Sequence, residues 1–307
     1  MATNEIDRRK FLKLVGIGGG VVFASGLGLY PRFAKAAWDG TGPSGAARST
    51  DFYFVQLSDT HFGFTDPLIN PNSDQMLQLA VDATNALEDQ PDFIMFTGDL
   101  TDIVDNDRER RRRLGAFKTV ASRLRCPMVR FMPGEHDASL DEGAAYKEFF
   151  GDTFYTFDHK GIHFVVIDNV SDPSGSIGAT QLAWLKATLA KFRKNDPIVV
   201  FTHRPLFALN PDWDWWTKDG QQAIDLLMPY ANVTVFYGHI HQNLTFTTGH
   251  INHYSARSTM FALPVSNSVP VKKKIPWDAA RPYAGLGFRE IDANPRKATY
   301  KKKEFPL

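Results

Sequence analysis

The chain has 307 residues, 43% of them hydrophobic, with 34 acidic and 35 basic residues. This length and composition can build a large hydrophobic core in one or two domains. A formal net charge of +1 excludes the strong global field typical of nucleic-acid-binding proteins, so we expect no nucleic-acid partner. Cys126 is the only cysteine in the sequence, which excludes an internal disulfide.

The first 36 residues have the three parts of an export signal. Asp7-Arg8-Arg9-Lys10-Phe11-Leu12-Lys13 resembles the twin-arginine signal, which directs folded proteins to the twin-arginine export machinery. A glycine-rich, weakly apolar stretch covers residues 15–30, and Ala34-Lys35-Ala36 offers a cleavage point. The glycines make a stable membrane span unexpected, although an uncleaved anchor is the alternative. We expect a signal peptide over 1–36, a loose leader over 37–49, and a periplasmic or secreted product.

Five apolar runs predict buried strands, with helical patterns between several of them. The runs cover residues 52–57, 93–97, 128–132, 197–201 and 233–237. Apolar residues at helical spacing predict helices after Ser73, up to Leu124, near 142–150, after Thr180 and after Asp219, with Ser73, Thr180 and Asp219 as candidate caps.

The rest of the chain favours strands over helices. Residues 154–157 and 162–167 predict a strand pair, and the pattern after Leu244 suggests antiparallel strands to about residue 291. Alternating strands and helices followed by a strand-rich half predict two packed sheets with helices outside. We expect one catalytic domain over 50–295 and a solvated basic tail over 296–307.

Side chains that bind metal ions follow each of the five buried runs. They are Asp59, His61, Asp99, Glu135, His136, His203, His239 and His241. Ligands in open α/β sheets bind at the carboxyl ends of the strands, so these side chains can converge. Mixed imidazole and carboxylate ligands suit zinc, manganese or iron.

The ligand candidates are too many for one tetrahedral zinc. Two ions sharing a bridging carboxylate would use them all, and two ions about 3.5–4 Å apart suit phosphoryl displacement. A water bridging the two ions would lose its proton readily and could act as the nucleophile.

These motifs in this order resemble the calcineurin-like metallophosphoesterase family, over about residues 52–261. The family pattern is Asp-x-His, Gly-Asp, Gly-Asn-His-Asp/Glu, His and Gly-His-x-His, and four of its five blocks match. The resemblance implies a four-layer α/β/β/α sandwich of two mixed sheets flanked by helices, with a two-metal centre. It implies three sets of roles: Asp59, His61 and His241 on one ion; His203, His239 and Glu135 on the other; and Asp99 bridging both.

The resemblance also assigns the catalytic pair and exposes one departure. It implies that His136 faces the substrate and protonates the leaving oxygen or steadies the phosphoryl charge, with Asp137 orienting it. The family usually has asparagine where this chain has Glu135, whose added negative charge should disfavour dianionic substrates. We therefore expect phosphodiesters to be favoured, and a metal preference shifted toward manganese or iron.

Candidate substrate contacts have two interpretations each. Trp213, Trp215 and Trp216 could form a rim against an organic group or anchor a packed loop. Arg257 could reach a phosphate or form a structural ion pair. The arginines at 108 and 110–113 are interleaved with acidic residues, which favours a solvated helix face over nucleic-acid binding. The other histidines are interpreted as structural or surface residues: His159, His163, His250 and His253.

The sequence thus predicts an exported metal-dependent phosphoester hydrolase acting on a small-molecule substrate, with phosphodiesters favoured. A pyrophosphatase, nucleotidase or phosphomonoesterase is the alternative within enzymes. A metal-binding module with little turnover, its site spoiled by Glu135, is the alternative from another class. The motifs specify how phosphorus is attacked and leave the attached group open.

Overall fold

The computed structural model describes residues 51–307, which form two mixed sheets flanked by helices. The predicted signal over 1–36 and the predicted leader over 37–49 both lie outside these residues. The first sheet has the order β11-β10-β1-β2-β3, and the second has the order β4-β5-β6-β7-β9-β8. The first sheet contains β1 (Phe52–Leu57), β2 (Phe93–Thr97), β3 (Val129–Met132), β10 (Gly287–Asn294) and β11 (Thr299–Pro306). The second contains β4 (Tyr155–His159), β5 (Ile162–Val166), β6 (Pro197–Phe201), β7 (Asn232–Tyr237), β8 (Thr245–Thr248) and β9 (Ile251–Ser255).

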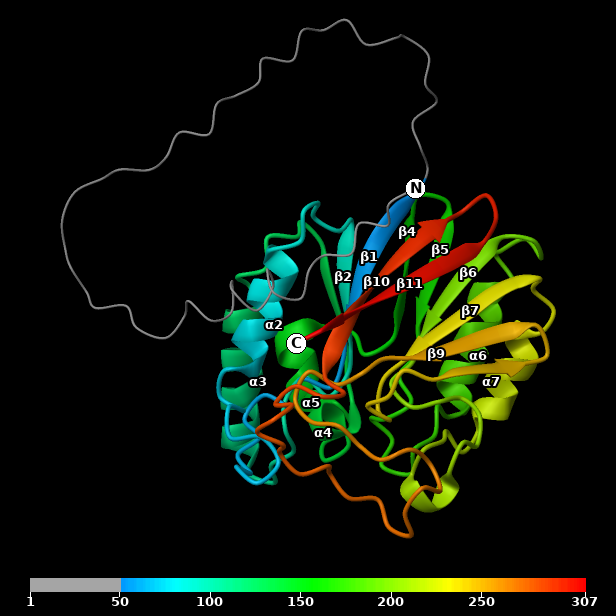
Figure 1. The fold of residues 1–307 in the computed structure, drawn as a ribbon. Coiled ribbons are helices and arrows are strands. Elements are labelled where there is room, and N and C mark those ends of the chain that lie inside the picture. The colour runs from blue at the N-terminus through cyan, green and yellow to red at the C-terminus, as the bar shows by residue number, and fades with distance from the viewer. Residues whose placement is uncertain (1–50) are drawn as a thin grey trace, which may run out of the picture. The chain divides into compact units, whose positions relative to one another are not determined.

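Helices cover the outer face of each sheet, which completes the expected sandwich (Figure 1). The helices α2 (Met76–Asn85), α3 (Asp107–Ala121) and α5 (Ala144–Phe150) pack on the first sheet. The second sheet is covered by α6 (Ala179–Leu189) and α7 (Gly220–Leu227). The sequence patterns did not predict two short turns of helix, α4 (Glu135–Ala138) and η1 (Pro211–Trp213), which lie in loops.

The apolar runs are buried on both faces because each strand packs against helices on one face and against the other sheet on its opposite face. In β1, Val55 and Leu57 face the helices, whereas Phe52 and Phe54 face the other sheet. Phe54 stacks on Phe93 of β2, with ring centroids 4.7 Å apart. Alternate side chains point to opposite faces of a strand, so a run that is apolar throughout fills both interiors.

Three predicted helix caps behave differently in the structure. The side chain of Ser73 caps no helix, since α2 begins after Gln75 without a side-chain cap. Thr180 lies inside α6, because the preceding Gly178 occupies the cap position. Asp219 precedes α7, but its carboxylate accepts from the N–H groups of Ile177 and Gly178 at 2.8 Å. The Asp219 side chain therefore accepts from N–H groups at the start of α6 rather than from those of α7, the helix that it precedes.

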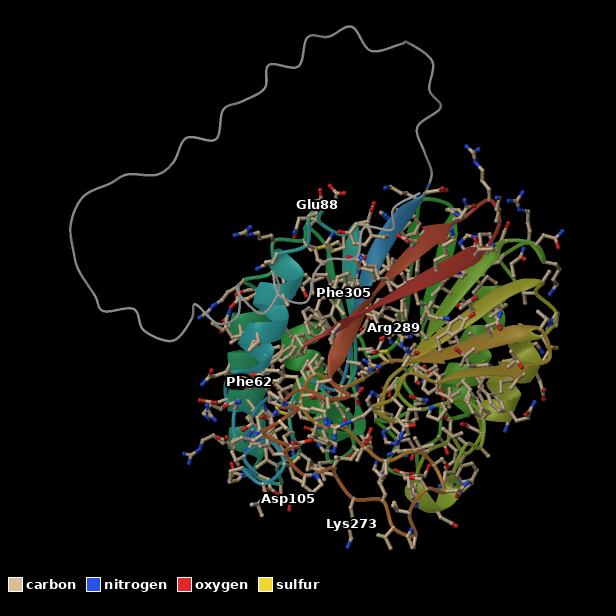
Figure 2. The ribbon with its side chains drawn as sticks, in the orientation of Figure 1. Phe62, Glu88, Asp105, Lys273, Arg289 and Phe305 are labelled. Carbon is tan, nitrogen blue, oxygen red and sulfur yellow. The ribbon has the colours of Figure 1, made fainter. Side chains whose placement is uncertain are left out.

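The last residues form a strand and not the expected solvated basic tail. β11 pairs antiparallel with β10 along eight residue pairs, and its Glu304 lies 2.9 Å from Arg289. Arg289 is fully buried and also donates to the carbonyl of Ser255, in the second sheet (Figure 2). The expectation of antiparallel strands from 244 to 291 holds only in part, since β9 runs parallel to β7 and residues 256–286 contain no strand.

No helix in the described range is both long and apolar enough to span a membrane.

Candidate metal centre

The strands deliver the predicted ligands to one edge of the sandwich, at the lower side of Figure 1. Five of them have left-handed backbone conformations, with φ values of 51° at Asp59, 39° at His61, 48° at Asp99, 64° at His239 and 54° at His241. This conformation costs a non-glycine residue roughly 1–2 kcal/mol. Strain concentrated in this way is typical of functional sites, where the surrounding structure holds it in place.

Two glycines allow the loops to approach closely enough to form the site. A Cβ on Gly134 would lie 2.1 Å from the backbone nitrogen of Asp99. A Cβ on Gly238 would lie 2.2 Å from the hydroxyl of Ser58 and 2.8 Å from the carboxylate of Asp59. No side chain fits in either place, so glycine precedes Glu135 and His239 for a steric reason.

The first ligand group consists of Asp59, His61 and His241. The carboxylate of Asp59 accepts from the N–H of His239 at 3.0 Å, which fixes its orientation. The Nε2 atoms of His61 and His241 lie 3.1 Å apart, and Nδ1 of His241 donates to the carbonyl of Phe261 at 2.7 Å. That outer hydrogen bond leaves the lone pair of Nε2 directed into the group, as metal-binding histidines require.

The second ligand group consists of Asp99, Glu135, His203 and His239. Glu135 spans the group, with one oxygen 2.8 Å from Nε2 of His203 and the other 2.8 Å from Nδ1 of His239. Burial raises the pKa of Glu135, but the charges on His239 and His203 outweigh burial and hold it well below its ordinary value. The outer nitrogens of His203 and His239 contact the carbonyls of Thr97 and Asp214.

Asp99 lies between the two groups. Its Oδ2 is 3.6 Å from Nε2 of His61 in the first group and 3.5 Å from Nε2 of His203 in the second. Its other oxygen accepts from the N–H of His136 at 3.0 Å. One carboxylate oxygen nearly equidistant from both groups matches the bridging position that the family resemblance implies for Asp99.

The residues present fit two cations. Asp59, Asp99 and Glu135 place three carboxylates in the two groups, where burial of unpaired charge is costly. Among the described residues, the arginine nearest Glu135 is Arg204, whose Nε is 3.9 Å away. Three buried atoms of the second group make no hydrogen bond to any described residue outside the group: Oε2 of Glu135, Nε2 of His203 and Nδ1 of His239. Buried polar atoms whose only close neighbours are one another fit the ligands of a cation.

His136 stands beside both groups, and its orientation depends on Asp102. The Nδ1 atom of His136 lies 3.2 Å from Asp102 and 3.0 Å from the N–H of Ile103. Asp102 is also 3.5 Å from Nδ1 of His61, so it serves a ligand and a candidate catalytic residue. Burial lowers the pKa of His136, but Asp99 and Asp102 outweigh burial and raise the pKa to about 9.

Asp137 does not hydrogen-bond to the His136 ring, which the family resemblance implies that it orients. Its carboxylate accepts instead from the N–H groups of Gly134, Leu100 and Thr101, at 2.9 Å each. Burial, together with the charge of Asp99, raises the pKa of Asp137 to about 7. Asp137 therefore holds the loops after β2 and β3 together, and Asp102 takes the place beside His136.

The family profile described as calcineurin-like phosphoesterase matches residues 52–243. The chain belongs to this family. It is 27% identical to the serine/threonine-protein phosphatase CPPED1 of Mus musculus over 219 residues, covering 62% of this chain and 70% of that protein. It is 27% identical to the probable glycerophosphodiester phosphodiesterase GpdQ of Arcobacter nitrofigilis over 203 residues, covering 61% and 71% of the two chains. A dimetal phosphatase structure from Danio rerio aligns with a TM-score of 0.53 at 14% identity, covering 78% of this chain and 92% of that one.

Family membership and the ligand set together make the chain a metal-dependent hydrolase of phosphoric esters. Two residues outside the family motifs complete the surroundings of the ions. Arg204, directly after His203, forms two 2.8 Å contacts with Asp214 while facing Glu135. The ring of Phe261 stacks on His61 with centroids 4.6 Å apart. The signals for both were weak, because an arginine and a phenylalanine in loops carry no distinctive spacing.

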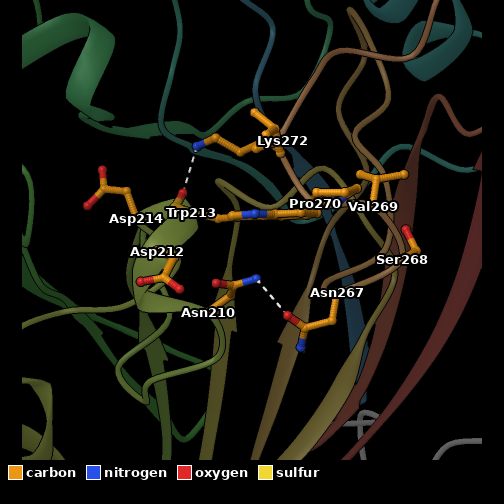
Figure 3. Close-up of a pocket in the computed structure, with 10 residues that line it drawn as sticks. Asn210, Asp212, Trp213, Asp214, Asn267, Ser268, Val269, Pro270 and Lys272 are labelled. Atoms are coloured by element: carbon orange, nitrogen blue, oxygen red, sulfur yellow. Dashed lines mark hydrogen bonds between the residues drawn. The ribbon is translucent and has the colours of Figure 1, made fainter.

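A cavity of about 700 Å³ opens beside the second ligand group. Trp213 forms one wall, and the segment from Asn267 to Lys272 forms another (Figure 3). Lys272 donates to the carbonyl of Trp213 at 2.7 Å. The cavity adjoins the metal centre because Asp214, which also lines it, accepts from His239 through its carbonyl.

The sequence left two interpretations open for the three tryptophans, a rim against an organic group or an anchor for a packed loop, and the structure separates them. Trp215 is fully buried in the core under the second sheet, so it anchors the loop and forms no rim. Trp213 packs edge-on against Trp215 at 5.0 Å and also lines the cavity. Trp216 is half-buried and is not among the residues lining the cavity. Trp213, although buried, is therefore the one tryptophan of the three that lines the cavity.

The remaining candidates lie away from the ligand groups. Arg257 is half-buried near Arg289 and has no ion pair with any described residue, so neither of its interpretations is supported. Arg111, Arg112 and Arg113 pair with carboxylates on and near α3, as expected for a solvated helix face. Arg110 departs from that expectation, because it is buried and pairs with Asp107 and Asp141. The four histidines interpreted as structural or surface residues all lie outside the ligand groups found within 51–307: His159, His163, His250 and His253.

Proposed function

We propose that this phosphoester hydrolase is exported and favours phosphodiesters over phosphomonoesters. The observation that carries the substrate preference is the division of seven ligand residues, six of them buried, into two groups with Asp99 between them and a glutamate at position 135. Bound ions at the two groups supply Lewis-acid stabilisation of the phosphoryl charge and activation of the attacking water. Zinc, manganese and iron all suit the mixed nitrogen and oxygen ligands.

His136 is the residue of this chain best placed to move a proton. Its Nε2 is 3.9 Å from Asp99, on the side of the ring that faces the ligand groups, and its side chain is 21% exposed. A substrate held between the groups would therefore meet an imidazole N–H near its leaving oxygen. Asp102, at 3.2 Å from the opposite nitrogen, keeps the ring in this orientation and stabilises its charged form.

Glu135 favours substrates with fewer negative charges. A phosphodiester carries one negative charge at neutral pH, whereas a monoester carries close to two. Glu135 adds a charge to the second group that asparagine would not add, and Arg204 offsets only part of it at 3.9 Å. The name of the Arcobacter relative, a probable phosphodiesterase, is consistent with this preference.

The cavity beside the second group is the proposed place for the organic part of the substrate. Its wall combines the apolar face of Trp213 with polar side chains, which suits a group with both apolar and hydrogen-bonding surface. A phosphomonoesterase is the second candidate, since the mouse relative is named a protein phosphatase. A pyrophosphatase or nucleotidase has no specific observation in its favour.

Turnover of bis(p-nitrophenyl) phosphate and p-nitrophenyl phosphate tests the proposed chemistry. With manganese, zinc or iron added, the diester should be hydrolysed with the higher kcat/KM, and His136→Asn should lose most of the activity. His163→Asn is a matched control, because that imidazole pairs with the exposed Asp158 far from the ligands. Absence of turnover with every metal would favour a metal-binding module, and a higher monoester rate would overturn the diester preference.

Export is tested separately with the full chain. Arg8 and Arg9 occupy the paired positions of the proposed twin-arginine signal. Replacing both with lysine should leave the enzyme in the cytoplasmic fraction of a host with this export machinery, whereas the unaltered chain should reach the periplasm. Equal distribution of the two forms would contradict export by the twin-arginine route.

A further inference from the structure

Exposed apolar side chains gather on the loops around the metal centre. Within residues 51–307, eight large apolar side chains are exposed, and seven follow β1, β2, β3 or β9 on loops at the ligand-bearing edge. Those seven are Leu68, Ile103, Leu140, Val265, Val269, Val271 and Ile275. Single exposed apolar residues are ordinary, but a collection on one face marks an interaction surface.

The loop after β9 carries four of the seven. Val265 is 65% exposed and Val271 is 59% exposed, on a segment without regular structure. Leu68, at 77%, joins the same surface, because the N–H of Trp277 donates to its carbonyl at 2.8 Å. The apolar residues are therefore on two loops tied together by a backbone hydrogen bond.

The same segment carries only positive charge. Residues 263–277 contain Lys272, Lys273 and Lys274 and no acidic residue. Lys272 donates to the carbonyl of Trp213, and the ammonium of Lys274 lies 5.0 Å from the ring centre of Phe261. These two lysines fasten the loop to the rim of the metal centre. Lys273 points away from the body of the molecule, and it has no ion pair with a described residue (Figure 2).

Acidic groups next to this surface are occupied. Asp278, which follows the segment, pairs with Arg281 at 3.1 Å. Asp66 uses its carboxylate to accept from the N–H of Leu68 at 3.0 Å. The exposed face of the two loops therefore presents aliphatic side chains around a free ammonium group.

We propose that Leu68, Val265, Val269, Val271, Lys273 and Ile275 form a docking surface for an anionic lipid bilayer. Aliphatic side chains that protrude from loops can enter the boundary between head groups and acyl chains, while a lysine among them is attracted to anionic lipids. Protein interfaces are instead enriched in aromatic residues and arginine and depleted in lysine. The surface has a lysine, unpaired within residues 51–307, among its aliphatic side chains, which favours a bilayer over a second copy or a peptide.

Docking in this way would bring the metal centre to the bilayer surface. If the proposed function also holds, phosphodiesters of lipid head groups would then be within reach of the ligand groups. Binding to lipid does not depend on turnover, so the two proposals can fail separately.

Co-flotation of the signal-free, metal-loaded chain with lipid vesicles tests the docking surface. The chain should float with vesicles of phosphatidylcholine and phosphatidylglycerol, float less with phosphatidylcholine alone, and be released as salt rises. Lys273→Glu should weaken binding at least about fivefold, from the contribution of one basic residue at an anionic surface. Lys301→Glu, at an exposed lysine of β11, is the matched control and should retain more binding than Lys273→Glu.

A triple variant tests the apolar part of the surface. Leu68→Ser, Val265→Ser and Ile275→Ser together should weaken vesicle binding about tenfold while hydrolysis of soluble bis(p-nitrophenyl) phosphate is retained. Failure of the unaltered chain to bind anionic vesicles would overturn the proposal, as would variants that bind equally well. Loss of a dimer in sedimentation experiments, without vesicle binding, would assign the surface to a second copy and also overturn it. Vesicle binding without any turnover would leave the docking surface standing and count against the proposed function.

Discussion

Replacing Glu135 with asparagine removes one negative charge from the second ligand group and tests the proposed substrate preference. The ligand atoms of this group lie within 4.8 Å of one another, so a phosphoryl group held there would be about 5 Å from the carboxylate. At an effective dielectric constant of about 20, two unit charges about 5 Å apart interact by about 3 kcal/mol. Arg204, with its Nε 3.9 Å from Glu135, reduces this repulsion. We take about 2 kcal/mol as the net effect, equivalent to about 30-fold in rate.

The assay compares kcat/KM for a phosphodiester and a phosphomonoester at one pH with saturating metal. Because the monoester carries close to one more negative charge, Glu135→Asn should lower the diester-to-monoester ratio about 30-fold, mainly by improving the monoester. Glu148→Asn is the control, since Glu148 is exposed on α5 and pairs with Arg111. An unchanged ratio in Glu135→Asn, with metal content retained, would refute the electrostatic reasoning.

Three further changes follow from particular contacts. Asp102→Asn should lower kcat roughly 10–100-fold with little change in KM or metal content, because it removes the charge 3.2 Å from His136; kinetics and metal analysis check this. His253 is buried with its pKa lowered to about 4, so the unfolded state binds a proton first as pH falls below about 6.5. Stability from this group is complete above about pH 6.5 and is lost as pH falls toward 4. In urea titrations, the unfolding free energy of the unaltered chain should fall between pH 7 and pH 4.5 by about 2–3 kcal/mol more than that of His253→Gln. An equal fall in the two proteins would contradict this. Glu304→Gln should lower the unfolding free energy by about 3 kcal/mol, because it leaves Arg289 buried without its partner; an unchanged Tm would show that the pair contributes nothing.

The sequence predicted that the candidate ligands lie close together, because each follows an apolar run typical of a buried strand. The parallel strands β1, β2 and β3, like β6 and β7, end at one edge, so the order of motifs along the chain became proximity in space. The left-handed backbone at Asp59, His61 and Asp99 could not be predicted, because aspartate and histidine adopt it more often than most residues but still in only a small minority of cases. Such strain comes from tertiary contacts, including the close approach at Gly134.

Errors arose where neighbours in sequence were taken as neighbours in space. Asp137 follows His136, but the two lie in a helical turn where consecutive side chains point in different directions. Asp102, 34 positions earlier, reaches His136 because the loop after β2 packs against α4. The sequence did not predict the strand β11, because its lysines are typical of protected edge strands as well as of solvated tails.

The metal content of the purified chain tests the two-ion centre most directly. Protein saturated with manganese, zinc or iron and freed of excess metal should contain two ions per chain, because two complete ligand groups are present. His203→Gln should reduce the content to about one, since the first group does not include His203. His250→Gln, at an exposed histidine outside both groups, should leave it at two. One ion or none in the unaltered chain, or equal loss in both variants, would contradict the proposed centre.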